Sequence, residues 1–278
     1  MSGRPREPWS RALVPEVGRR WNVDFRDLCG ITISDLTKDD ACGLLAELIE
    51  RYDGPCRVVL FAHTNTLTHA LKDECFTGII NSADFLFGDG TGVRWAFSLS
   101  RSRIPKDNVN GTDLVPRLLG RTRNPGYRYF LLGGGEEMIR RSAAGARTLF
   151  PACEIVGYHH GYVAVAEDDS LVDRINAAEP HLLLVGMGSP LQEQWIARNR
   201  HRLRVPLVLS VGGLFSYWAG ELKRAPAWFR RSGIEWVYVL GQQPWKWRRY
   251  LLDAPILLAR ICLGRRAGNA VREDGKRC

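Results

Sequence analysis

Asp89 is the residue whose type and setting best suit acid–base chemistry. It lies in the sequence GDGTG at 88–92, directly after the short apolar run 85–87. A side chain at the end of a strand faces the cleft of an α/β sheet, and a carboxylate there can accept the proton of an attacking hydroxyl group. Asp-Gly is also a common turn pair, so an aspartate that bonds only to its own loop is an equally good interpretation of this spacing.

Glycine-rich or small polar sequences follow five apolar runs, and their repetition indicates a ligand that carries phosphate. Glycine lets backbone N–H groups approach a phosphate, and the N-terminus of the next helix favours negative charge. The carboxyl ends of parallel strands meet at one edge of the sheet, where ligands bind. A single such loop would say little, because glycine also serves ordinary turns. The five loops span residues 63–65, 88–92, 133–135, 186–190 and 211–213.

Two predicted helix starts add polar side chains near these loops. In the sequence NGTD at 110–113, helix capping and ligand contact explain the residues about equally well. The pair QE at 192–193 follows Pro190, and this is ordinary chemistry for a helix start, so the residues alone favour a structural role there. The residues concerned are Asn110, Gly111, Thr112, Asp113, Gln192 and Glu193.

The best-known nucleotide motifs are incomplete. The loop 133–135 is followed by Glu136, Glu137 and Met138, so the third glycine of the dinucleotide fingerprint is missing, and no GxxxxGK[ST] sequence occurs. Glu154 lies 19 positions after Gly135, near the spacing of a ribose-binding acid. An oxidoreductase with a nucleotide cofactor therefore stays an alternative, although no group for hydride transfer is visible.

Composition gives no sign of a metal site or of secretion. His159 and His160 have no carboxylate or cysteine at metal-ligand spacing, so we expect no bound metal. The seven cysteines form no CxxC pair, which suits a reducing compartment better than a disulfide framework. We also find no signal peptide, and no apolar stretch of the roughly 18–20 residues that would span a bilayer.

The elements that must position these loops alternate between strands and helices. Short apolar runs separated by amphipathic segments are typical of an α/β, Rossmann-like fold, with a mainly parallel sheet and helices on both faces. We expect strands at 57–62, 85–87, 127–132, 181–185 and 207–211, and helices at 40–52, 67–80, 112–121, 136–149, 171–178 and 191–201.

The chain divides into three predicted parts. Residues 1–24 form a poorly ordered leader, residues 25–222 an α/β catalytic domain, and residues 223–278 a basic, aromatic-rich helical appendage. The appendage holds 13 Lys and Arg against 4 Asp and Glu, whereas residues 1–222 hold 26 of each, so the net charge of +9 lies in the appendage. Such a surface attracts anionic lipid, a diphosphate or nucleic acid.

Residues 244–264 resemble a segment that lies on a membrane surface. Tryptophan and tyrosine prefer the membrane interface, and basic side chains reach toward lipid headgroups. Two other interpretations stay open: a helical hairpin packed on the body or in an oligomer interface, and a nucleic-acid patch. The side chains concerned are Trp245, Lys246, Trp247, Arg248, Arg249, Tyr250 and Arg260.

Ten motifs, in order from about residue 25 to residue 250, give the sequence a family resemblance. They are HTN at 63–65, GDGTGV at 88–93, NGTDLVP at 110–116, FLLGG at 130–134, HHGY at 159–162, LLVGMGSPLQEQW at 183–195, VGGLF at 211–215, KRAPAW at 223–228, GIEW at 233–236 and WRRY at 247–250. In these motifs the chain resembles the WecG/TagA/CpsF family of bacterial glycosyltransferases.

The resemblance implies an inverting transferase that works without a bound metal or other cofactor. Its donor would be a UDP-sugar, of the N-acetylmannosamine type or glucose, and its acceptor a sugar on a polyprenyl diphosphate. The products of the family feed exopolysaccharide, capsule and other cell-envelope polymers. Such an enzyme would be cytoplasmic and peripheral, on the anionic inner face of the cell membrane, with no nucleic-acid partner.

The resemblance also assigns roles to residues. Asp89 matches the proposed catalytic base, Thr64 and Asn65 match pocket residues beside the acceptor and donor, and Gln192 and Glu193 match the part that faces the nucleotide sugar. The appendage would bring basic side chains over the site, with Arg248 or Arg249 near the leaving diphosphate. The other expected contacts are Gly90, Asn110, Gly111, Thr112, Asp113, Gly133, Gly134, Gly186 and Gly212 with the substrates, and Arg224 and Lys246 with the diphosphate or membrane.

Three positions depart from the family pattern. Asn108 and Val239 stand where the family commonly has arginine, and Ser216 stands where it commonly has aspartate. Arginine binds a diphosphate with two parallel hydrogen bonds, which neither asparagine nor valine can replace. We therefore expect a rearranged donor site or a different sugar, with nearby basic residues of the appendage taking over.

Overall fold

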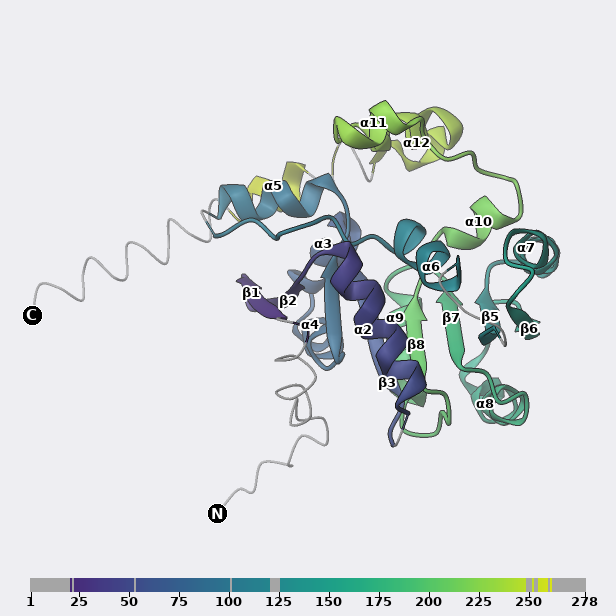
Figure 1. The fold of residues 1–278 in the computed structure, drawn as a ribbon. Coiled ribbons are helices and arrows are strands. Elements are labelled where there is room, and N and C mark those ends of the chain that lie inside the picture. Colours follow the sequence, from purple (N-terminus) through teal and green to yellow (C-terminus); the bar gives the residue numbers. More distant parts are fainter. Residues whose placement is uncertain are drawn as a thin grey trace, which may run out of the picture.

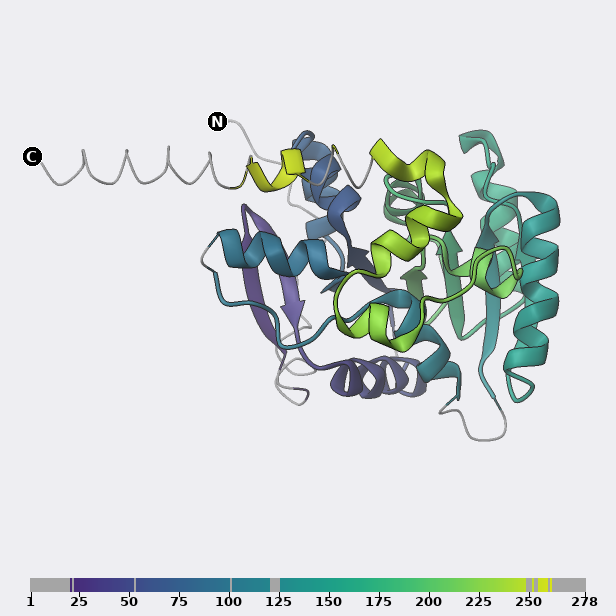
Figure 2. The same cartoon turned by 90° about the horizontal axis from the view of Figure 1, so that it is seen from above.

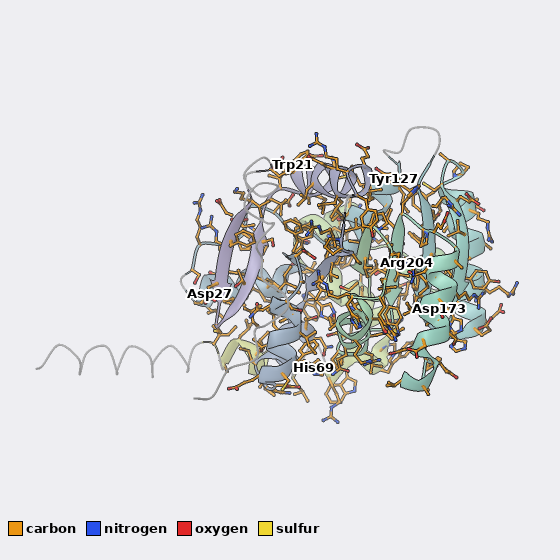
Figure 3. All side chains as sticks on the ribbon, turned by 90° about the horizontal axis from the view of Figure 1, so that it is seen from below. Trp21, Asp27, His69, Tyr127, Asp173 and Arg204 are labelled. Carbon is orange, nitrogen blue, oxygen red and sulfur yellow. The ribbon has the colours of Figure 1, made fainter. Side chains whose placement is uncertain are left out.

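The computed structural model describes residues 21, 23–52, 54–100, 102–120, 126–248, 252, 255–259 and 261. Most of the predicted leader, and Arg249, Tyr250, Arg260 and residues 262–278 of the appendage, lie outside the described residues. Trp21 packs on the helix at 38–50, where its indole N–H donates to Glu47 at 2.6 Å and Gly43 leaves room for the ring (Figure 3).

The described strands form one eight-stranded sheet in the order β1-β2-β4-β3-β8-β7-β5-β6 (Figure 1). β1 pairs with β2 antiparallel, and every other described pair is parallel, as the sequence predicts. The strands are β1 (Asp24–Leu28), β2 (Ile31–Asp35), β3 (Arg57–Ala62), β4 (Phe85–Gly88), β5 (Arg128–Gly133), β6 (Glu154–His159), β7 (Leu182–Gly186) and β8 (Leu207–Ser210).

Helices cover both faces of this sheet, which confirms the predicted Rossmann-like class. Side chains alternate along each strand, so Val59 and Phe61 of β3 enter one apolar core while Val58 and Leu60 enter the other. The first core is closed by α2 (Lys38–Glu50), α6 (Gly111–Gly120), α7 (Glu136–Leu149) and α10 (Leu214–Trp218). The second is closed by α3 (Thr64–Ala70), α4 (Glu74–Asn81), α5 (Thr91–Leu99), α8 (Asp168–Ala177) and α9 (Leu191–Asn199).

The single helix predicted at 67–80 is two helices. Asp73 interrupts it, because its carboxylate accepts hydrogen bonds from the N–H groups of Cys75 and Phe76 at 2.9 and 3.2 Å and so caps a new helix, α4. The chain therefore ends α3 at Ala70 and turns before α4 begins. This turn keeps α3 short, and Thr64 and Asn65 form its first turn, directly after the N-cap His63.

Helical segments follow the sheet from residue 223 onward. They are α11 (Ala227–Arg231), α12 (Glu235–Gln242) and the 3-10 turn η2 (Pro244–Lys246), and residues 255–259 are again helical. Figures 1 and 2 show α11 and α12 above the carboxyl ends of the parallel strands. No helix in the described ranges is both long enough and apolar enough to cross a bilayer.

Candidate active site

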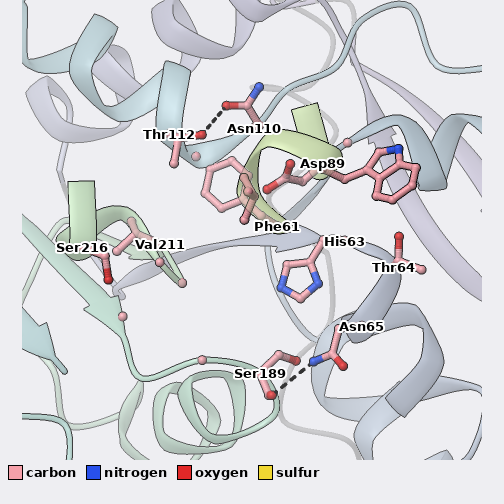
Figure 4. A pocket seen from close by; sticks show the side chains of 18 of the residues that line it. Phe61, His63, Thr64, Asn65, Asp89, Asn110, Thr112, Ser189, Val211 and Ser216 are labelled. Carbon is pink, nitrogen blue, oxygen red and sulfur yellow. Dashed lines mark hydrogen bonds between the residues drawn. The ribbon is translucent and has the colours of Figure 1, made fainter. Parts of the chain in front are cut away.

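A cavity of about 660 Å³ lies between the carboxyl ends of the parallel strands and the C-terminal helices (Figure 4). Loops that follow β3, β4, β5, β7 and β8 supply its floor, so the five glycine-rich or small polar loops predicted at strand ends converge on one site. The predicted residues that line it are Thr64, Asn65, Asp89, Gly90, Asn110, Gly111, Thr112, Gly134, Gly186, Gln192, Gly212 and Arg224.

Asp89 lies at the end of β4, on a turn that is held from two sides. Its own N–H donates to the carbonyl oxygen of Ala62 at 2.8 Å, and the N–H of Gly90 donates to Oδ1 of Asn108 at 2.7 Å. Gly90 has φ +92°, a conformation that glycine adopts without strain. The half-buried carboxylate of Asp89 is thereby presented to the cavity (Figure 4).

Three helix N-termini point positive charge at this cavity. α5, α7 and α9 begin just after cavity-lining loops, and their N-cap residues Gly90, Gly135 and Pro190 make no side-chain capping hydrogen bond. The first-turn N–H groups of such helices lack intrahelical acceptors and favour an anion. The arrangement suits a phosphate or diphosphate group.

The loop after β3 supplies His63, Thr64 and Asn65. Nδ1 of His63 accepts the N–H of Thr66 at 3.2 Å and so caps α3, which places the proton of the neutral ring on Nε2. Nδ2 of Asn65 donates to the carbonyl oxygen of Ser189 at 3.4 Å and ties this loop to the loop after β7 (Figure 4). His63 was not singled out from the sequence, although it directly follows a predicted strand.

Gln192 connects the loops that follow β7 and β8. Its Oε1 accepts the N–H groups of Gly188 and Gly212, both at 3.2 Å, and its Nε2 donates to Oε1 of Glu193 at 2.9 Å. Glu193 is 1% exposed and does not line the cavity. Burial raises the pKa of Glu193, although the hydrogen bond from Gln192 opposes this shift. Glu193 contacts Gln192, which lines the cavity, and so it can affect the site only through Gln192.

The predicted helix start at 110–113 both caps α6 and holds the appendage. Oδ1 of Asn110 accepts the N–H of Asp113 at 2.8 Å and the hydroxyl of Thr112 at 2.9 Å. The Asp113 carboxylate accepts from Lys38 Nζ at 3.0 Å and forms an ion pair with Arg224. Burial alone would raise the pKa of Asp113, but Arg224, Asn110 and Lys38 outweigh it and hold this pKa below its usual value.

Arg224 is bound mainly to the protein itself. Besides Asp113, its guanidinium donates to the hydroxyl of Thr112 at 2.9 Å and to Oε1 of Glu235 at 2.7 Å, and it lies 5.6 Å from the ring centre of Tyr217. It still lines the cavity, so it joins the appendage to α6 at the edge of the site. Arg230 lines the cavity as well, 3.7 Å from Asp113.

Several predicted contacts lie away from the cavity. Gly133 does not line it, and instead lets β5 approach β7, because a Cβ there would collide with the Gly186 backbone. The exposed Arg248 also lies outside the cavity, 5.9 Å from the ring centre of Trp247. Nothing is described of the Lys246 side chain or of Arg249, so their predicted contacts stay predictions.

The three departures from the family pattern, Asn108, Ser216 and Val239, all line the cavity. Other lining residues were not singled out from the sequence. Met138 and Met187 lie beside or within predicted strand-end loops, whereas the place of the other residues over the cavity depends on how later segments pack. These other residues are Tyr162, Tyr217, Arg230, Glu235 and Trp236. Within the described residues, no three His, Cys, Asp or Glu side chains gather as a metal site would require.

Residues 26–270 match the sequence model of the glycosyl transferase WecG/TagA/CpsF family. The chain belongs to this family. It is therefore a glycosyltransferase. The chain is 33% identical over 183 residues to an N-acetylglucosaminyldiphosphoundecaprenol N-acetyl-beta-D-mannosaminyltransferase of Bacillus subtilis (strain 168), covering 66% of this chain and 70% of that protein. It is 29% identical over 208 residues to the protein of the same name from Staphylococcus aureus (strain MW2), covering 75% of this chain and 80% of the relative.

Proposed function

We propose that this glycosyltransferase moves a sugar from a UDP-sugar to a sugar carried on a polyprenyl diphosphate, with Asp89 as the catalytic base. One observation carries the proposal: Asp89 ends β4 inside a cavity where the N-termini of α5, α7 and α9 converge. The names of the relatives, which transfer N-acetylmannosamine to a diphosphoundecaprenol-linked sugar, support the acceptor class.

The reaction follows from these groups. An acceptor hydroxyl attacks the anomeric carbon and gives its proton to the Asp89 carboxylate, while the bond between that carbon and the UDP oxygen breaks. Helix N-termini and cavity-lining arginines stabilise the charge that develops on the leaving diphosphate, so the proposed mechanism uses neither a metal nor another cofactor. Attack from the face opposite UDP inverts the configuration.

The carboxylates of the cavity support Asp89 as the base. Among the described residues, Asp89 and Glu235 are the acidic side chains that line it. Glu235 accepts from Arg224 at 2.7 Å, so its carboxylate already serves to hold Arg224 at the edge of the cavity. A single displacement also needs no second carboxylate as nucleophile.

We further propose that the donor is an N-acetylmannosamine-type sugar or glucose. The names of the relatives, which specify transfer of N-acetylmannosamine, support the first of these donors. Asn108, Ser216 and Val239 line the cavity where the family resemblance leads us to expect charged residues, so they would alter the contacts with this donor. The polymer that receives the sugar would belong to exopolysaccharide, capsule or another part of the cell envelope.

The appendage is proposed to hold the enzyme on the inner face of the cell membrane. Trp245 and Trp247 are 68% and 47% exposed, and Arg248 beside them is also exposed. Aromatic side chains at the interface and basic ones near anionic headgroups are the usual means of such binding. Salt-sensitive binding to anionic vesicles would support this role, and equal binding to neutral vesicles would contradict it.

The direct test is UDP release by the purified full chain with a panel of UDP-sugars, with and without a polyprenyl-diphosphate-linked N-acetylglucosamine in liposomes. Acceptor-dependent release with one donor would establish the reaction and name that donor. Release of equal rate without acceptor, or no release with any donor, would contradict the proposal. The anomeric configuration of the isolated product tests inversion.

A further inference from the structure

Trp95 is a large apolar side chain that borders the cavity and is nonetheless 49% exposed. It lies on α5, four residues after Thr91, where that helix begins at the cavity. Leu99, one turn further along the same face, is 40% exposed, whereas Val93, Ala96 and Phe97 point into the core. α5 therefore carries an outward apolar strip that starts at the edge of the cavity.

Apolar side chains from two other segments also line the cavity. Leu191 at the start of α9 lines the cavity and is 60% exposed. Pro255 and Leu258 of the C-terminal segment also line it. We refer to Trp95, Leu191, Pro255 and Leu258 as the apolar mouth. The cavity floor mixes glycine loops and polar side chains with a few apolar ones, among them Phe61, Met187 and Val211.

We propose that the apolar mouth binds the first isoprene units of the lipid that carries the acceptor sugar. This inference rests on the proposed function. The acceptor is an amphiphile whose diphosphate would take the N-terminus of α5, which leaves those of α7 and α9 to the donor diphosphate, and whose chain must leave the cavity. Trp95 lies about 6 Å along the helix axis from Thr91, which is in the first turn of α5, and this distance is roughly one helical turn. A diphosphate at the start of α5 would thus have its chain beside Trp95 and then Leu99.

An isoprenoid suits this mouth better than a protein partner does. A stable protein interface takes about 20–30 residues on each side, and the mouth has four, arranged around an opening. A chain a few atoms wide can contact Trp95 and Leu191 together while its head group stays in the cavity. The relatives, whose names specify an undecaprenol diphosphate, act on a lipid of this chemistry.

The test measures binding without catalysis, so that it can fail separately from the proposed function. Geranyl diphosphate, which has two isoprene units, and methyl diphosphate, which has none, are titrated into the full chain by calorimetry in the absence of membranes. Burial of the two apolar units predicts binding at least about tenfold tighter for geranyl diphosphate. Equal affinities for the two compounds would overturn the proposal.

Variants locate the effect. Trp95→Ala should reduce the ratio of the two affinities to about two- or threefold, and Leu99→Ala should reduce it less. Leu149→Ala is the matched control, because Leu149 is 57% exposed at the end of α7 and lies outside the cavity. An unchanged ratio of the two affinities in Trp95→Ala, with normal melting, would overturn the proposal. If this variant instead only bound vesicles more weakly, Trp95 would be assigned to contact with the bilayer. In the wild type, tighter binding of geranyl diphosphate without any sugar transfer would instead count against the proposed function.

Discussion

Oδ1 of Asn108 accepts the N–H of Gly90 at 2.7 Å, and this bond fixes the turn that presents Asp89 to the cavity. The side chain at position 108 thus binds the loop after β4. An arginine, which the family resemblance leads us to expect at position 108, could not accept this hydrogen bond, because a guanidinium has donors only. With asparagine at position 108 the cavity lacks the positive charge of an arginine, and the turn that carries the proposed base Asp89 gains a hydrogen bond.

Asn108→Ala should slow transfer more than it weakens substrate binding. The variant leaves the Gly90 N–H without its acceptor and lets the Asp89 turn move, which we expect to lower kcat about tenfold with a smaller change in KM. The control is Asn81→Ala, which removes a comparable bond to the Thr32 N–H at 3.0 Å in the distant β1–β2 hairpin. Equal kcat values in the two variants would show that Asn108 does not position Asp89.

Arg224 and Asp113 should be energetically coupled and sensitive to acid. Their side chains are 28% and 23% exposed, so Arg224→Ala and Asp113→Asn should each lower the free energy of unfolding by about 1–3 kcal/mol. In a double-mutant cycle, the sum of the losses in the two single variants should exceed the loss in the double variant by more than about 0.5 kcal/mol. Additive effects would mean that the pair does not join the appendage to α6.

The pH dependence of this pair has a definite sign. The folded pKa of Asp113 lies below its usual 3.8, so the contribution of its carboxylate to stability is fully present above that value and is lost as pH falls through the folded pKa. The stability difference between wild type and Asp113→Asn should be constant above about pH 5 and shrink below about pH 4. Urea unfolding at a series of pH values measures it. A difference that grows in acid would contradict the assignment.

Glu193→Gln should stabilise the protein at neutral pH and leave it little changed in acid. Burial raises the folded pKa of Glu193 above its usual 4.5, so wild-type stability falls as pH rises from that value through the folded pKa. Glutamine has no charge to bury and can still accept from Nε2 of Gln192. Glu193→Ala lacks this acceptor and should cost about 1–3 kcal/mol. Melting temperatures at pH 4 and pH 7 separate these outcomes, and a glutamine variant less stable at pH 7 would refute the expectation.

Gly133→Ala should be strongly destabilising even though Gly133 does not line the cavity. Its φ is +149° and a Cβ would collide with the Gly186 backbone, so β5 and β7 would have to separate at their carboxyl ends. We expect a loss of about 2–4 kcal/mol. Gly78→Ala is the control, since a Cβ on that α4 residue meets nothing within 4 Å and should stabilise the helix by up to about 1 kcal/mol. Equal melting temperatures would contradict the packing argument.

The local pattern predicts the parallel strands and most helices well, because buried β-branched runs and amphipathic periods are local properties. The runs at 57–62 and 136–149 match β3 and α7 residue for residue. The β1–β2 hairpin was missed because its turn is Cys29-Gly30, with φ +55° and +82°, and lacks the usual Asn-Gly signal. β6 was missed because this edge strand is mostly half-exposed and has no apolar run.

The candidate site was partly predictable for the same reason. Strand-end loops follow directly from the strands, so Asp89 and Gln192 could be placed at the cavity from local sequence and motif. The pairing of Arg224 with Asp113 joins residues 111 positions apart, and the position of Glu235 over the cavity depends on how the appendage docks. No local pattern contains that information.

The most direct test of the central claim is the rate of sugar transfer by Asp89→Asn under single-turnover conditions. The account predicts a loss of at least about 100-fold with unchanged donor binding and normal melting, because an amide keeps the shape but cannot accept the proton. Asp27→Asn is the matched control, since Asp27 is an exposed aspartate near the end of β1 that accepts the N–H of Gly30 at 3.3 Å. A rate in Asp89→Asn close to that of the control would contradict the account and assign Asp89 to the turn alone.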